Sequence, residues 1–138
     1  MIKETTILRD SGLRKMFDNV RNARVNNRYY DWKVVVKLLA TSPAPKFYIT
    51  PKMAEQYVLN FNRGKFLVKS SIGRAMIRDL AENYERIKSQ YPYKKAFEIW
   101  QLVVDSPAKS FYLKEKTIRY IIYEYLRPQT NRTHKRGS

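Results

Sequence analysis

The sequence predicts an all-α protein made of two tandem copies of a three-helix unit, followed by a short basic tail. Three observations support this prediction. Apolar side chains recur at helical spacing in six segments, prolines and capping residues stand between those segments, and one motif occurs twice. The predicted copies span residues 1–64 and 65–128, and the tail spans residues 129–138.

The repeated motif is a Ser-Pro-Ala triplet followed by a Phe-Tyr pair. It stands at residues 42–44 with 47–48, and again sixty-four positions later at 106–108 with 111–112. At that offset, eleven of sixty-four positions are identical without a gap, and five of the eleven fall within seven positions. Apolar positions elsewhere also coincide in helical register, which favours a duplication. The alternative is one irregular helical domain in which the Ser-Pro-Ala triplet serves twice as a helix start.

The first predicted helix runs from residue 5 or 6 to about residue 24. Leu13, Met16, Phe17 and Val20 form its apolar face, and Gly12 leaves open a break near residues 10–11. The second runs from residue 30 or 31 to residue 41. Its valine triplet at 34–36 would also suit a strand, but the length of the segment and the matching copy decide for a helix.

The third predicted helix has the clearest start. Thr50 is placed as its cap and Pro51 at its first position, while Pro43 and Pro45 end the helix before it. Gly64 is the expected stop. Its inner face is formed by apolar and aromatic side chains, as is the matching face of the second copy: Ala54, Tyr57, Val58 and Phe61, then Ile118, Ile121, Ile122 and Tyr125.

The second unit repeats this plan after a short connector at 66–68. The predicted helices span about residues 70–90, 94–105 and 114–127, with Pro92 and Pro128 as stops. Acidic side chains on the first of them, Asp79, Glu82 and Glu85, are expected to pair with bases on the same helix. In the repeated motif, the serines are expected to end neighbouring helices, and Phe47 and Phe111 to fill gaps between helices.

Charge gives the main indication of function. The formal net charge is +16, with twelve basic against five acidic residues in 1–64, thirteen against seven in 65–128, and three against none in the tail. So basic a chain favours nucleic acid as the partner, with an anionic membrane second, although the expected basic amphipathic helix for a membrane is missing. There is no cysteine, no signal-like apolar start and no membrane-length apolar run, so a cytoplasmic location is expected.

The outline of each unit resembles a helix-turn-helix or another small tri-helical nucleic-acid-binding domain. A connection of about eight residues between the second and third helices departs from the three or four of a helix-turn-helix. Gln56 and Asn60 lie one turn apart on the outward face of the third helix, and amide side chains pair with adenine in a major groove. Double-stranded DNA is therefore preferred over RNA, with Lys52 and Arg63 on phosphates.

The remaining candidate residues divide into two groups. Further nucleic-acid contacts are expected from basic side chains of the first helix and of the sixth: Arg14, Arg21, Arg24, Lys116, Arg119 and Arg127. A protein partner, or a second copy of the chain, is expected at Tyr120, Tyr123 and Leu59. These aromatics support the alternative hypothesis of a structural or adaptor protein within a nucleoprotein complex.

Catalysis is not expected. The single histidine, His134, falls in the predicted tail, no thiol exists, and the four glycines form no phosphate loop. No cofactor, metal or small-molecule substrate is predicted. The sequence therefore favours a protein that acts by binding.

Overall fold

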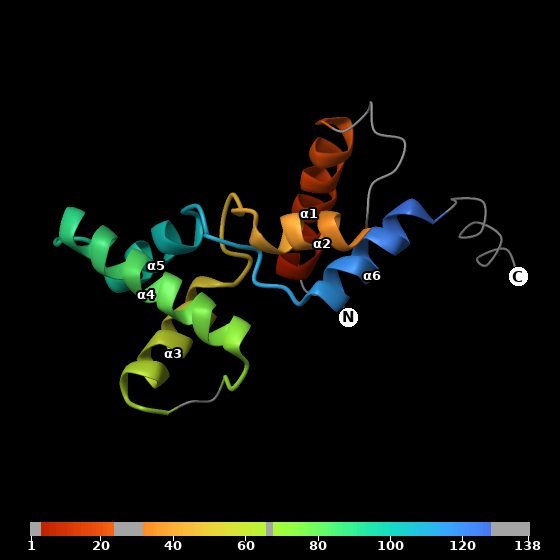
Figure 1. Cartoon of the computed structure of the whole chain (residues 1–138). Coiled ribbons are helices and arrows are strands. Elements are labelled where there is room, and N and C mark those ends of the chain that lie inside the picture. The colour runs from red at the N-terminus through yellow and green to blue at the C-terminus, as the bar shows by residue number, and fades with distance from the viewer. Residues whose placement is uncertain (1–3, 24–31, 66–67, 128–138) are drawn as a thin grey trace, which may run out of the picture.

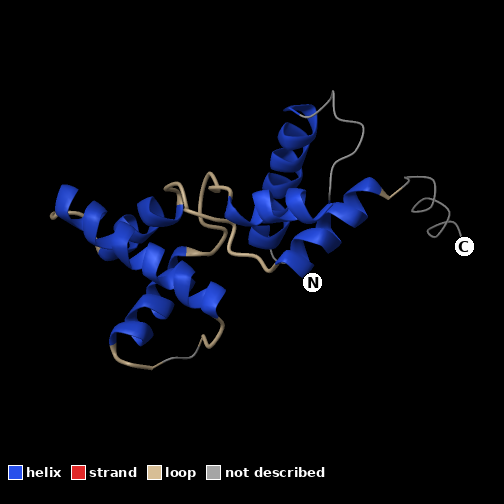
Figure 2. Cartoon of the chain, in the orientation of Figure 1, coloured by secondary structure: helices blue, strands red, loops and turns tan. Residues whose placement is uncertain are grey.

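The computed structural model describes residues 4–23, 32–65 and 68–127, and within these ranges the chain is all-helical (Figures 1 and 2). Its helices are α1 (Glu4–Ala23), α2 (Trp32–Thr41), α3 (Pro51–Asn62), α4 (Ser71–Gln90), α5 (Ala96–Val104) and α6 (Glu115–Leu126). The only β-type pairing in the described ranges is one isolated antiparallel bridge between Ala44 and Ala108. Arg24, positions 66–67 and the predicted tail lie outside the described residues.

Local sequence signals position the helix ends. The Thr50 side chain accepts a hydrogen bond from the Met53 amide at 3.2 Å, with Pro51 next to the cap, and Ser70 accepts one from the Gly73 amide at 3.0 Å. The predicted bounds are confirmed to within two residues at each end. Gly12 does not break α1, which continues through it.

The helices pack as two bundles. Bundle A consists of α1, α2 and α6, and bundle B consists of α3, α4 and α5; each helix contacts only the two others of its own bundle. The sequence predicted that α3 would join α1 and α2, and that α6 would join α4 and α5. The contacts differ from this expectation, because each of these two helices packs in the opposite bundle (Figure 1).

Two crossing linkers account for this exchange. The first linker, residues 42–50, leads from α2 to α3, and the second linker, residues 105–114, leads from α5 to α6. Where they cross, the amide of Ala44 donates to the carbonyl of Ala108 and the amide of Ala108 to the carbonyl of Ala44, both at 3.0 Å. The chain therefore leaves bundle A after α2 and enters bundle B, and it leaves bundle B after α5 and returns to bundle A.

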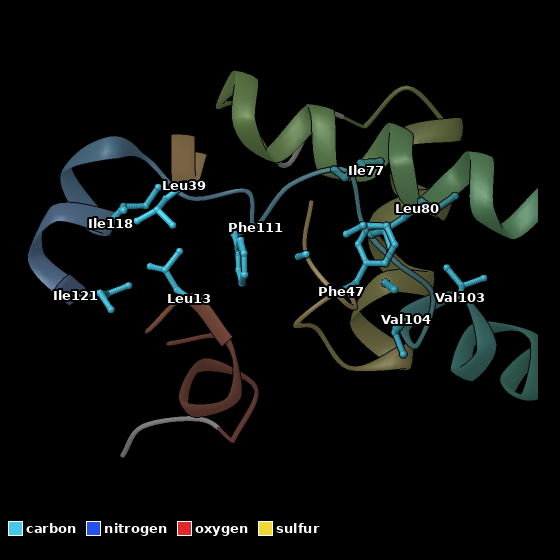
Figure 3. Packing of buried hydrophobic residues seen from close by; sticks show 14 of the residues in the cluster. Leu13, Leu39, Phe47, Ile77, Leu80, Val103, Val104, Phe111, Ile118 and Ile121 are labelled. Atoms are coloured by element: carbon cyan, nitrogen blue, oxygen red, sulfur yellow. The ribbon is translucent and has the colours of Figure 1, made fainter. Parts of the chain in front are cut away.

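Aromatic side chains of the linkers fill the space on both sides of the crossing. Phe47 stacks on Tyr112 with ring centroids 6.4 Å apart, and Tyr48 stacks on Phe111 at 5.9 Å. Both phenylalanines are buried, as expected. Figure 3 shows Phe111 beside Leu13 and on the side of bundle A, and Phe47 on the side of bundle B. Each linker thus contributes one ring to the core of the bundle that it enters.

A buried carboxylate fixes the second linker. Asp79 of α4 is 3% exposed and accepts hydrogen bonds from the Lys109 amide at 2.9 Å, the Tyr112 hydroxyl at 2.5 Å and the Asn83 side chain at 2.9 Å. Tyr112 adopts a left-handed φ of 56°, which is uncommon for a residue with a side chain. The expected ion pairs of Asp79 along its own helix are thus replaced by contacts to the linker, while Glu82 pairs with Lys109 at 3.0 Å.

Gly12 explains how the first linker can approach α1. A Cβ atom at this position would lie 2.5 Å from the hydroxyl oxygen of Tyr48 and 3.4 Å from the ring of Phe111. Burial of Tyr48 raises the pKa of its hydroxyl group. The glycine costs some helix propensity, but it leaves room for the stacked Tyr48–Phe111 pair against the helix.

Candidate nucleic-acid interface

One face of α3 points away from bundle B. Lys52, Gln56, Leu59 and Arg63 recur on it every three or four residues and are all exposed, opposite the buried Ala54 and Val58. We call these four residues the α3 stripe. Asn60, predicted to pair with Gln56, is half-buried beside this stripe. Of the site residues predicted on the outward face of α3, Lys52, Gln56, Leu59 and Arg63 are thus exposed, and Asn60 lies at the margin of that face.

The corresponding face of α6 points away from bundle A. Lys116, Arg119, Tyr120 and Tyr123 are exposed on it, with the tyrosine side chains 64% and 66% exposed, and Arg127 stands at its carboxyl end. We call these five residues the α6 stripe. Its Lys116, Tyr120, Tyr123 and Arg127 stand sixty-four positions after the four members of the α3 stripe.

Four cations of the two stripes are available for a ligand. In the part of the chain that the structure describes, Lys52, Arg63, Lys116 and Arg119 take part in no ion pair. Arg127 differs, because its guanidinium lies 3.5 Å from a carboxylate oxygen of Glu124. An unpaired cation on an exposed helix face can meet a phosphate without first losing a protein partner.

Two of the basic residues predicted on the first helix, Arg14 and Arg21, make contacts within bundle A. Arg21 forms an ion pair with Asp18 at 3.0 Å, and Arg14 lies over the ring of Tyr125, 5.9 Å from its centroid. Asp18 also accepts a hydrogen bond from the Tyr125 hydroxyl at 2.6 Å, which raises the pKa of that tyrosine. Arg14 thus contacts α6 through Tyr125, whereas Arg21 is engaged within α1 by Asp18.

The sequence analysis missed an exposed aromatic and basic cluster at the turn between α4 and α5. Tyr93 is 80% exposed and Phe97 is also largely exposed, and Lys95 lies between them in the sequence. Lys94 lies over the ring of Tyr91 and pairs with Glu98 at 3.9 Å. A proline between two tyrosines, followed by two lysines, is the sequence signal that marks this turn.

The crossing linkers also border two hollows. One, of about 320 Å³, is lined by Thr5, Thr6, Arg9, Tyr48 and other residues of α1, α3, α4 and both linkers; the other, of about 610 Å³, lies at Ala75, Tyr112 and Lys114. Arg9 is paired with Asp10 there, so its charge is already compensated. Within the described ranges, no group of three or more metal-ligating side chains is found. No described helix combines the length and apolar character needed to cross a membrane.

Comparisons with protein families, curated proteins and solved structures find no match for this chain.

Proposed function

We propose that the chain is a duplicated three-helix unit that binds nucleic acid, with duplex DNA preferred over RNA, and that it acts by binding without chemistry of its own. One observation carries this proposal. The outward faces of α3 and α6 present cations that have no ion pair in the described ranges, opposite the faces that build the core. At a net charge of +16, such faces favour polyanions.

The α3 stripe has the chemistry of a helix that enters a major groove. Lys52 and Arg63 lie near its two ends and are placed to hold phosphates, while Gln56 lies between them and can pair with a base edge. In a helix-turn-helix, the last two helices of the unit, here α2 and α3, would pack on each other. They do not contact each other in this structure, so the resemblance to a helix-turn-helix does not extend to their packing. The proposal therefore depends on the stripe itself. We also propose that the protein acts in the cytoplasm.

The experiment is a binding titration of the full chain with labelled duplex DNA, duplex RNA and single strands across a salt series. We expect duplex DNA to bind most tightly, with a steep fall in affinity as salt rises. Lys52→Glu combined with Arg63→Glu should weaken DNA binding by about ten- to hundredfold, because two phosphate contacts are lost. The melting temperature should stay unchanged, since both residues are exposed.

The matched control reverses two exposed cations elsewhere. Lys15→Glu combined with Lys37→Glu changes the net charge by the same amount on α1 and α2 of bundle A. If this control weakens binding as much as the α3 variant, the effect is one of total charge and the stripe is not the site. Weak binding that is equal for all ligands and vanishes near physiological salt would contradict nucleic-acid binding altogether.

A second candidate function is that of an adaptor that binds a protein within a nucleoprotein complex. Tyr120 and Tyr123 favour it, because two adjacent aromatic side chains with about two thirds of their surface exposed are typical of protein interfaces. Leu59, at 45% exposure, occupies the matching place on α3. Tyr120→Ala combined with Tyr123→Ala should then abolish self-association or partner capture and leave the helical circular dichroism signal intact. Assembly that is unchanged in this variant would contradict the adaptor function.

A further inference from the structure

We propose that one molecule binds duplex DNA at two half-sites in inverted orientation, with α3 on one half-site and α6 on the other. This inference rests on the proposed function and specifies its ligand. A protein with two-fold symmetry presents two equivalent helices to DNA, and the DNA site mirrors that symmetry. Here a single chain supplies both helices.

The first step is an internal two-fold relation. The Ala44–Ala108 bridge pairs residues sixty-four positions apart through reciprocal hydrogen bonds of equal length. Exchanging the two halves turns the Phe47–Tyr112 stack into the Tyr48–Phe111 stack. It also turns the helix contacts of bundle A into those of bundle B. These pairings define an approximate two-fold axis that passes between Ala44 and Ala108.

The second step is the position of the two stripes relative to this axis. Figure 1 shows α3 at the lower edge of bundle B and α6 at the lower right edge of bundle A, on either side of the crossing linkers. Both stripes face away from the other helices of their bundles. The two-fold relation makes the α3 stripe and the α6 stripe equivalent, and Figure 1 places both helices along the lower side of the molecule, as a two-fold site requires.

The third step compares the chemistry of the stripes. Their amino-terminal ends carry the same charge, Lys52 and Lys116, whereas the middle positions differ: Gln56 and Leu59 on α3 correspond to Tyr120 and Tyr123 on α6. Lysines hold phosphates and specify no sequence, whereas the middle positions would meet bases. The backbone contacts should consequently be two-fold symmetric, and the two half-sites should differ in base sequence.

The test measures salt dependence on a labelled mixed-sequence duplex of about two helical turns, because half-sites on one face of DNA are about one turn apart. Two variants each remove two cations that have no ion pair in the described ranges: Lys52→Ala with Arg63→Ala on α3, and Lys116→Ala with Arg119→Ala on α6. Each should reduce the log–log salt slope by about 2, and the combined variant should reduce it by about 4. Binding should saturate at one protein per duplex. Unchanged melting temperatures of the variants would show that the fold is intact.

Phosphate ethylation interference on a duplex selected from a random pool then tests the inverted orientation. Two groups of interfering phosphates, related by a two-fold axis, are expected, and each variant should abolish interference in one group only. Tight duplex binding with a single group, or a salt slope that responds to one variant alone, would overturn the two-half-site inference and leave the proposed function standing. Absence of duplex binding would overturn both.

Discussion

At the scale of single residues, Asp79 shows how one carboxylate can determine the course of a linker. It is the only charged residue that is buried in the described ranges, and its oxygens accept hydrogen bonds from the Lys109 amide and the Tyr112 hydroxyl. These contacts hold Tyr112 in its left-handed conformation against the cost of that backbone geometry. Nothing local in the sequence distinguishes Asp79 from the exposed acids near it, since its partners in the second linker lie thirty or more positions away.

Replacing this carboxylate gives the first prediction. Asp79→Asn should lower the free energy of unfolding by about 1–3 kcal/mol, because the new amide group cannot accept from all three donors and leaves one of them buried without a partner. Chemical denaturation measures the change. The control is Glu82→Gln, which breaks an exposed ion pair to Lys109 and should cost clearly less than Asp79→Asn, because water screens exposed charges. Equal losses in both variants would contradict the role assigned to Asp79.

The hydroxyl group of Tyr112 gives a prediction about pH. Burial raises the pKa of this tyrosine, and its hydrogen bond to Asp79 and the negative charge of that residue raise it further. The folded chain therefore retains the proton to higher pH than the unfolded chain, whose tyrosines titrate near pH 10. The stabilisation is complete below about pH 10 and decreases as the pH rises above it.

Alkaline denaturation followed by circular dichroism tests this dependence. Tyr112→Phe should be less stable than the parent chain at neutral pH, by about 1 kcal/mol for the lost hydrogen bond. Between neutral pH and pH 11 or so, the variant should lose less stability than the parent. Parallel pH curves for the two proteins would show that Tyr112 does not contribute to alkaline unfolding.

At the scale of elements, most of the helical structure could be predicted because its signals are local. The Thr50-Pro51 start, Pro92 and the apolar spacing of α4 are read within one or two turns of chain, and each coincides with an observed helix end or buried face. Asn60 shows the limit of register arguments. It lies close enough to the packed face of α3 to be half-buried, although its spacing from Gln56 predicted full exposure.

The two halves of the chain offer a matched test of helix capping. Thr50 caps α3 through its side chain, whereas Lys114, sixty-four positions later, begins α6 with extended backbone and no side-chain cap. Thr50→Ala should destabilise the protein by about 1 kcal/mol, and Lys114→Thr should stabilise it by a similar amount. Thermal unfolding of both variants measures the shifts. A stabilising Thr50→Ala or a destabilising Lys114→Thr would contradict the capping assignment.

The partners of α3 and α6 could not be predicted from the same signals. The inner face of α3 holds Ala54, Val58 and Phe61, and that of α6 holds Ile118, Ile122 and Tyr125 at the same spacing. Both patterns indicate that one face of the helix is buried, but neither indicates which helices cover that face. The choice depends on contacts far apart in sequence, such as the hydrogen bond between Tyr125 and Asp18.

At the scale of the whole molecule, the exchange of α3 and α6 means that neither half of the sequence forms a complete bundle by itself. Residues 1–64 contribute α1 and α2 to bundle A but α3 to bundle B, and residues 65–128 do the reverse. The halves are therefore held together by two sets of core contacts as well as by the peptide chain. We expect these buried contacts to hold the two halves together after the chain is cut between α3 and α4.

Cleavage between α3 and α4 tests this consequence. A protease site inserted after Lys65 should allow complete cutting, seen on a denaturing gel, while light scattering in native buffer still gives one particle with the mass of the whole chain. The uncut protein with the same insertion is the control. If the halves packed as separate consecutive units, cutting would instead release two particles of about half the mass.

The same exchange sets an order of events while the chain is being synthesised. Bundle B is continuous in sequence from Pro51 to Val104, whereas bundle A joins α1 and α2 to α6 near the other end of the described chain. A ribosome adding about 5–20 residues per second separates the emergence of α2 from that of α6 by roughly 4–15 s. Through that interval, Leu13, Val35 and Leu39 lack their final cover on the nascent chain. Bundle A, whose first two helices are synthesised before any helix of bundle B, is thus the bundle that is completed last.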